Sequence, residues 1–158
     1  MERIDIVCVG TLKEKYLKEL CGEYQKRLTR FCKMNITELP ESKLPNDPSD
    51  KEIERALENE AKMILNSTEG SYRIAMCIEG DNPTSEKLAK IMENAVAIKG
   101  HVAFIIGSSH GLADKVKQAS DLRISMSRMT FPHQIARGML LEQIYRSYMI
   151  RGGGSYHK

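Results

Sequence analysis

Three segments in the C-terminal third of the chain combine residue types that suit ligand binding or catalysis. The first reads IIGSSHGL at residues 105–112, where Gly107 and Gly111 flank a short polar run. Glycines at such positions let the backbone approach a ligand closely and offer its amides as hydrogen-bond donors. A plain strand-to-helix turn explains the same letters equally well, so this segment alone does not decide between the two.

The second segment reads ISMSRMTFPHQ at residues 124–134. Adenine is commonly bound by apolar side chains together with backbone hydrogen bonds, and Met126, Met129 and Phe131 could line such a slot. The alternative is a helix start with ordinary core packing. His133 falls in the first turn of the helix that Pro132 opens, where a histidine is more often structural than catalytic.

The third segment is the terminal RGGGSYHK at residues 151–158. Tyr156 could stack on a nucleobase, and Lys158 could meet a phosphate. Chain ends are also where disorder is commonest, so the alternative is a tail without a function.

Several familiar enzyme signatures are absent from the chain. It has no G-x-x-x-x-G-K-[ST] loop, no G-x-G-x-x-G after the first strand and no G-x-S-x-G elbow, which disfavours nucleotide hydrolases, dehydrogenases and serine hydrolases. The four cysteines are scattered without a C-x-x-C pair, and there are only four histidines. We therefore expect buried free thiols in a reducing compartment and no metal site.

The charge of the chain is unevenly distributed. Residues 1–111 hold 16 basic and 18 acidic side chains, whereas residues 112–158 hold 8 basic and 3 acidic ones. Such asymmetry suits an anionic partner such as nucleic acid, although a solvated basic surface explains it equally well.

Strand and helix patterns alternate along the chain. Apolar runs predict strands, three- and four-residue spacings predict helices, and Ser49 with Glu52 forms a capping-box pattern. We predict strands at residues 4–9, 33–39, 72–78, 102–106 and 122–127, and helices at residues 15–30, 50–65, 85–98, 112–119 and 132–149.

This alternation predicts an α/β fold with a mainly parallel sheet and helices on both faces. Ligands bind at the carboxyl ends of strands in such sheets, which points to the turns at Glu79-Gly80, Gly107-Ser108 and Ser127-Arg128. We expect a single domain over residues 1–158. With no membrane-length apolar stretch and no signal-peptide pattern, we also expect a cytoplasmic protein.

Taken together, these segments resemble the RlmH family, bacterial methyltransferases of the SPOUT class. The similarity covers the whole chain. It includes VGTLK at residues 9–13, the Gly107 loop, MTFPHQ at 129–134 with Arg137 one turn later, EQIYR at 142–146, and the final YHK. Members commonly carry two glycines where this chain has Gly107-Ser108, a leucine where it has Met76, and a less glycine-rich tail.

The resemblance implies a C-terminal trefoil knot, which overrides the unknotted sheet that the pattern alone predicts. It places knot and cofactor site within roughly residues 72–158. It also implies a homodimer that uses S-adenosylmethionine to methylate N3 of a pseudouridine in 23S ribosomal RNA. The implied cofactor contacts are Met76, Gly107, Met126, Ser127, Arg128, Met129, Thr130 and Phe131.

For catalysis we expect positioning and electrostatic stabilisation to dominate, because the methyl group of the sulfonium is already activated. The candidate catalytic residues are His133, Arg137, Tyr156 and His157, the tail coming from the partner subunit. The candidate RNA-binding residues are Arg128, Arg146, Arg151 and Lys158. Having one domain, the enzyme should select its target in the assembled ribosome. Alternatives are a SPOUT methyltransferase for another RNA nucleotide, or a non-catalytic ribosome-associated RNA-binding dimer.

Overall fold

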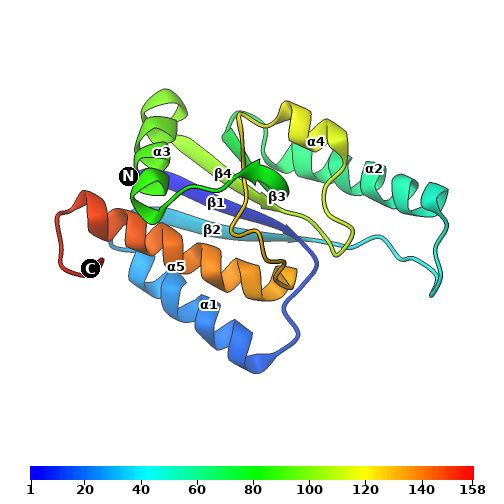
Figure 1. Ribbon diagram of the computed structural model, residues 1–158, viewed down its shortest axis with the longest axis horizontal. Helices are drawn as coiled ribbons and strands as arrows, with labels where there is room; N and C mark the ends of the chain where they lie inside the picture. The colour runs from blue at the N-terminus through cyan, green and yellow to red at the C-terminus, as the bar shows by residue number, and fades with distance from the viewer.

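The computed structural model describes all 158 residues of the chain, as ten alternating strands and helices (Figure 1). The elements are β1 (Glu2–Val9), α1 (Lys15–Leu28), β2 (Cys32–Leu39), α2 (Asp50–Ser67), β3 (Tyr72–Asp81), α3 (Ser85–Lys99), β4 (His101–Ile106), α4 (Asp114–Ala119), β5 (Leu122–Ile124) and α5 (His133–Arg151).

The five strands form one sheet in the order β2-β1-β4-β3-β5, and every pairing is parallel. Helices α1, α3 and α5 pack together on one face, while α2 and α4 cover the other (Figure 1). The predicted α/β class with helices on both faces is thereby confirmed.

Alternation along the strands supplies both apolar layers. Ile6 and Phe104 belong to the core under α1, α3 and α5, whereas Val9 and Ile105 belong to the core under α2 and α4. Neighbouring strand residues point to opposite faces, so a strand covered on both sides must be apolar throughout. The run at residues 102–106 meets that requirement, and all five of these residues are buried.

Side-chain caps set the starts of two helices, and the predicted capping box at Ser49 is one of them. The Ser49 hydroxyl accepts from the Glu52 backbone N–H at 3.2 Å, and the Glu52 carboxylate accepts from the Ser49 N–H at 3.1 Å. Thr84 caps α3 by accepting from the backbone N–H of Lys87 at 3.1 Å. Both caps satisfy amides that the first helical turn leaves without partners.

The predicted strand at 122–127 is too long, and the predicted strand at 72–78 is too short. Met76 and Asp81 both pair with Ile124, so residues 77–80 leave the ladder between them. Gly80 permits this excursion, since a Cβ there would lie 2.6 Å from the Ile124 nitrogen. The Ser125 N–H then donates to the Asp81 carbonyl at 2.7 Å, and β5 ends.

The cysteines behave as small buried side chains. Cys8, Cys21 and Cys32 are buried, Cys77 is partly buried, and all four are free thiols. Burial raises the pKa of Cys8 to about 12, which keeps that thiol protonated at neutral pH. None of the helices is both long enough and apolar enough to span a membrane.

A polar cluster lies where β1, β2 and β4 run side by side near their amino ends. The buried Asp5 carboxylate accepts hydrogen bonds from Asn35 at 3.2 Å and from Arg3 at 3.2 Å, and it contacts His101 Nε2 at 2.7 Å. Burial acts to raise the pKa of Asp5, but these hydrogen bonds together outweigh it and hold the pKa below its usual value.

We expect Asp5→Asn to lower the free energy of unfolding at pH 7 by about 1–3 kcal/mol, because a charged acceptor of several hydrogen bonds is lost. A depressed folded pKa stabilises the protein above the unfolded pKa of about 4, and the contribution is lost as the pH falls through the folded value. The deficit of the variant should therefore shrink as the pH falls from about 5 through the unfolded pKa and below it. Urea unfolding across this range measures it, with the exposed Asp47→Asn as control. A deficit that does not change with pH contradicts the assignment.

Candidate active site

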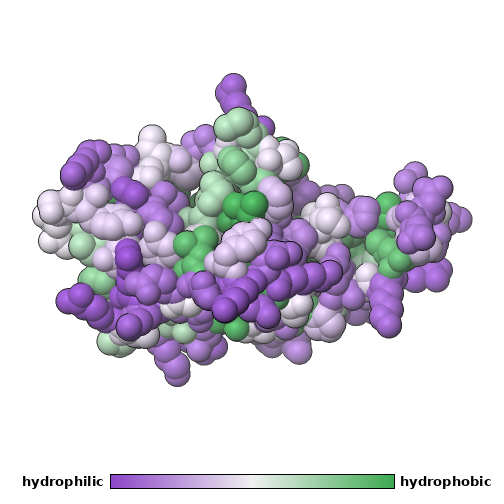
Figure 2. Space-filling view, turned by 90° about the horizontal axis from the view of Figure 1, so that it is seen from below, coloured by the Kyte–Doolittle hydropathy of each residue, from purple (hydrophilic) through white to green (hydrophobic).

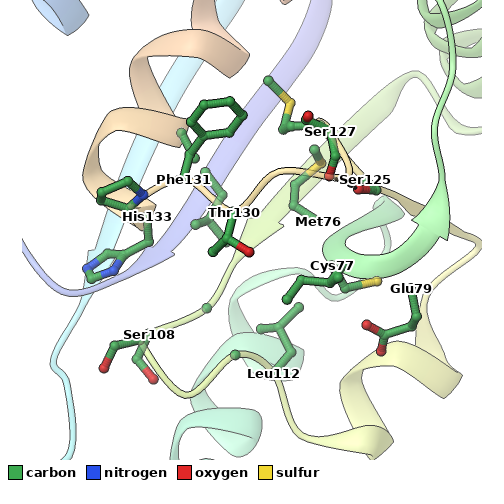
Figure 3. A pocket seen from close by; sticks show the side chains of 18 of the residues that line it. Met76, Cys77, Glu79, Ser108, Leu112, Ser125, Ser127, Thr130, Phe131 and His133 are labelled. Carbon is green, nitrogen blue, oxygen red and sulfur yellow. Dashed lines mark hydrogen bonds between the residues drawn. The ribbon is translucent and has the colours of Figure 1, made fainter.

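A pocket of about 700 Å³ opens where β3 and β4 end, and the segment between β5 and α5 borders it (Figure 3). Its volume falls within the range typical of sites for small organic ligands. It lies at the carboxyl ends of the strands, as the alternation of strands and helices predicts, and all three of the turns named from the sequence contribute to its lining.

The lining includes seven of the eight residues predicted to contact a cofactor: Met76, Gly107, Met126, Ser127, Met129, Thr130 and Phe131. The eighth, Arg128, belongs to the same segment but is exposed and outside the lining. In Figure 3, Ser108 and His133 lie on one side of the pocket and Glu79 on the other, with Met76, Leu112 and Thr130 between them.

Gly107 is required by the close approach of two backbone segments. A Cβ at this position would lie 2.3 Å from the Gly111 carbonyl oxygen, a separation that no side chain can tolerate. The Gly111 N–H donates to the Ser108 carbonyl at 2.9 Å, which closes the loop into a tight turn. Glycine at this position therefore lets the two ends of the turn pack directly against each other.

The segment that follows β5 is held by its own hydrogen bonds. The Ser125 hydroxyl donates to the Ser127 carbonyl at 2.9 Å, and the Met129 N–H donates to the Ser127 hydroxyl at 3.0 Å. The side chain of Asn82 donates to the Ser125 carbonyl at 2.9 Å. These bonds fix the loop that presents Met126 and Met129 to the pocket.

An ion pair lies on the rim of the pocket. Glu79, in the excursion of β3, pairs with Lys117 of α4, whose hydrogen bond lowers the pKa of the Glu79 carboxyl. Beside it, burial raises the pKa of the Cys77 thiol. The pocket thus holds one negative and one positive side chain at one end, while most of its surface is apolar or hydroxyl-bearing.

His133 lines the pocket from the first residue of α5, but Arg137, one turn later, does not. The Arg137 side chain is 3% exposed; it donates to Glu38 at 2.7 Å and to the Gly10 carbonyl at 3.2 Å. Glu38 also accepts from the Leu12 N–H at 3.2 Å. Arg137 therefore joins α5 to the loop after β1 and to the end of β2.

Tyr156 and His157 lie at the opposite end of α5 from His133. A helix of 19 residues spans roughly 27 Å, so one chain does not bring its own tail to its own pocket. Tyr156 packs edge-on against Tyr145, with ring centroids 5.0 Å apart. His157 contacts Glu86 at 2.5 Å and Arg146 at 3.1 Å.

The four predicted RNA-binding residues differ in how their charges are used. Arg146 pairs with Glu142 at 2.9 Å, and Arg151 pairs with Glu2 at 2.8 Å. Arg128 and Lys158 are exposed and form no ion pair within the chain. Those two charges are consequently available to an anionic partner without breaking an internal contact.

Apolar side chains are exposed on the surface shared by α1 and α5. The exposed residues are Tyr16 and Leu20 of α1 and Ile135 of α5. Of these, Tyr16 is 64% exposed. Figure 2, which looks at the molecule from the α1 side, shows hydrophobic surface gathered in the middle of this face. Contiguous apolar surface of this kind marks protein–protein contacts.

Two features of the pocket carry no signal in the sequence. Lys117 looks like any solvated lysine of a short helix, and only the fold brings it beside Glu79. Leu112 was expected as the first residue of a helix, but α4 begins at Asp114, and Leu112 is instead buried beneath the pocket. No group of three histidine, cysteine or acidic side chains is arranged to hold a metal ion.

The chain is similar to known proteins over its whole length. A family model described as a predicted SPOUT methyltransferase matches residues 2–157. The chain is 49% identical to ribosomal RNA large subunit methyltransferase H of Clostridioides difficile, over 98% of this chain and 99% of that protein. It is 45% identical to the protein of that name from Streptococcus uberis, over 99% of each chain.

Solved structures share the fold at low sequence identity. A probable methylase family protein from Haemophilus influenzae superposes with a TM-score of 0.56 at 13% identity, covering 99% of this chain and 71% of that one. The tRNA (m1G37) methyltransferase of Aquifex aeolicus gives 0.54 at 12% identity, covering 91% and 69%. The predicted trefoil knot fits this fold class. The family match and the full-length similarity together show that the chain belongs to the RlmH family of SPOUT methyltransferases.

Proposed function

We propose that this protein transfers a methyl group from S-adenosylmethionine to N3 of a pseudouridine in 23S ribosomal RNA, within the assembled ribosome. The observation that carries the proposal is the pocket built by Gly107 and residues 126–131 in a chain of this family. The relatives' printed name, which specifies large-subunit ribosomal RNA, supports the choice of substrate.

The residues of the pocket fit S-adenosylmethionine. Met76, Met126 and Leu112 offer apolar surface for a purine, and the Gly107 turn, which lines the same pocket, would supply backbone hydrogen bonds to it. The cofactor would supply an electrophilic methyl group on a positively charged sulfur. The lining carries few charged groups, so the protein's task is to align this methyl group with the acceptor and to exclude water.

His133 is the ionisable pocket residue on the side where α5 begins, and we assign it contact with the acceptor base. The N3 proton of the base lies between two carbonyls and must leave, with His157 or solvent taking it. Donors near the two carbonyl oxygens stabilise the anion that reacts. For Arg137 we propose a role in positioning, because its guanidinium is already bound to Glu38 and to the Gly10 carbonyl.

We propose further that two chains pair through the apolar α1–α5 surface, with their α5 helices antiparallel. A twofold axis then places the tail of each chain, with Tyr156 and His157, at the partner's pocket. This arrangement explains why the tail and His133 lie at opposite ends of one helix. The unpaired Arg128 and Lys158 would meet RNA phosphates.

Adding one methyl group at Gly107 should abolish tight cofactor binding. Gly107→Ala forces the Gly111 carbonyl to move, and we expect the affinity for S-adenosylhomocysteine to fall by at least about tenfold. Isothermal titration calorimetry measures it. Gly22→Ala is the matched control, since a Cβ there meets nothing within 4 Å. Equal affinity in both variants contradicts the proposed pocket, and a parent protein that binds no cofactor contradicts the function.

The substrate is tested by mass spectrometry of ribosomal RNA nucleosides. Cells that lack the gene should lose 3-methylpseudouridine, and the restored gene should return it. In vitro, ribosomes should be methylated far better than a short isolated hairpin if the enzyme recognises an assembled ribosomal surface, as proposed. Loss of a different modified nucleotide supports the alternative of another SPOUT target. Efficient methylation of the hairpin would contradict the need for the ribosome.

Mixed dimers test whether the tail acts on the partner. Neither His133→Ala nor His157→Ala should turn over alone, but hybrid dimers hold one pocket with both histidines if the tails are exchanged. Random mixing should restore roughly a quarter of the parental activity per site. A tail that serves its own pocket restores none, and full turnover by His157→Ala alone would remove this residue from the mechanism.

A further inference from the structure

A buried carboxylate on α2 joins the turn after β4, which lines the pocket, to the segment after β2. Glu60 is 3% exposed. The Ser108 hydroxyl donates to its Oε1 at 3.2 Å, and the Ser42 backbone N–H donates to its Oε2 at 3.1 Å. Both donors are uncharged, and they belong to segments that are far apart in the sequence.

Packing alone does not explain a carboxylate at this position. Glu60 adjoins the apolar cluster in which Ala61 and Ile64 of α2 meet Leu112 and Val116. Taking a charged group out of water is costly, and an apolar side chain would fill the same space without that cost. The two hydrogen bonds are therefore what the carboxylate contributes to the protein.

One of these bonds fixes the turn that faces the ligand. Ser108 directly follows Gly107, lines the pocket and is itself buried. Its carbonyl accepts from the Gly111 N–H, and its hydroxyl is held by Glu60. The turn has glycine at both ends, so its backbone lacks the restraint that side chains would supply. The bond to Glu60 anchors the turn to a long helix.

The other bond fixes the segment after β2. The Ser42 hydroxyl also donates to the Ala56 carbonyl at 3.3 Å, which ties this segment to α2 a second time. Its neighbour Glu41 reaches the loop after β1, where its Oε2 lies 3.6 Å from the position of a Cβ on Gly10. His133 Nε2 lies 4.0 Å from the same position. The segment held by Glu60 thus lies near His133, which lines the pocket.

We propose that Glu60 is a positioning residue that presets both loops, the Gly107 turn for the cofactor and the segment around Ser42 for the neighbourhood of His133. The proposal rests on the cofactor use proposed above. Glu60 touches no substrate in this role. Before the ligand binds, Glu60 holds the backbone of the loops in the conformation that the ligand requires. Without this restraint, the required conformation would be populated less and the ligand would bind more weakly.

Three variants of the full-length protein test this role: Glu60→Gln, Ser108→Ala and the double variant. Glutamine keeps the shape but can accept at only one of the two oxygens, and alanine removes the hydroxyl donor. We expect each single variant to bind S-adenosylhomocysteine about five- to tenfold more weakly, and the double variant to bind no worse than the weaker single one. The KM for S-adenosylmethionine should rise in the same variants. Glu54→Gln, an exposed charge change on the same helix, is the matched control.

Amide hydrogen exchange at residues 107–111 supplies a second readout that does not need the cofactor. Exchange should accelerate in Glu60→Gln and in Ser108→Ala, while the global unfolding midpoint of Ser108→Ala stays near that of the parent. If Ser108→Ala keeps both the affinity and the exchange rates of the parent protein, the proposal is overturned. This holds even if Glu60→Gln fails to fold. Effects that add fully in the double variant overturn it as well. If the parent protein binds no cofactor but the variants still exchange faster than the parent, the proposed function is refuted. The role of Glu60 in holding the turn is then retained.

Discussion

The parallel pairing of all five strands is the constraint on which the pocket depends. Because every strand runs in the same direction, the segments that follow β1, β3, β4 and β5 must emerge at one edge of the sheet. The central β4 is covered on both faces and brings Gly107 to the middle of that edge. A reversed strand would carry its loop to the far edge, and the lining would be incomplete.

Local patterns predicted most of the elements, because their causes are local. The capping box at Ser49, the buried run at 102–106 and the helical spacings of α1 and α2 each specify an element without reference to the rest of the chain. The prediction was wrong at the end of β5 and at the start of α4. There the deciding interactions are the Ser125–Asp81 hydrogen bond and the burial of Leu112, which depend on distant residues. Strand order likewise leaves no mark on periodicity.

The candidate site shows the same division. The motif residues of the Gly107 turn and of residues 126–131 lie together, as the resemblance implied. Whether a basic side chain is unpaired depends instead on acidic residues that are distant in the sequence. Arg137 pairs with Glu38, and Arg151 pairs with Glu2. An excess of basic residues in the C-terminal part therefore overstates the charge offered to RNA. The charge available at the surface is determined by how many basic side chains lack an acidic partner, and not by their total number.

The Asp5 cluster and the pocket lie at opposite edges of the same sheet, and this separation has an evolutionary consequence. Substitutions in the loops after β3, β4 and β5 can retune what is recognised while the polar anchor near the strand starts remains unchanged. A lineage can then exchange one nucleotide target for another through steps that each leave a folded protein. A single scaffold of this size can in this way supply a set of paralogues with divergent specificities.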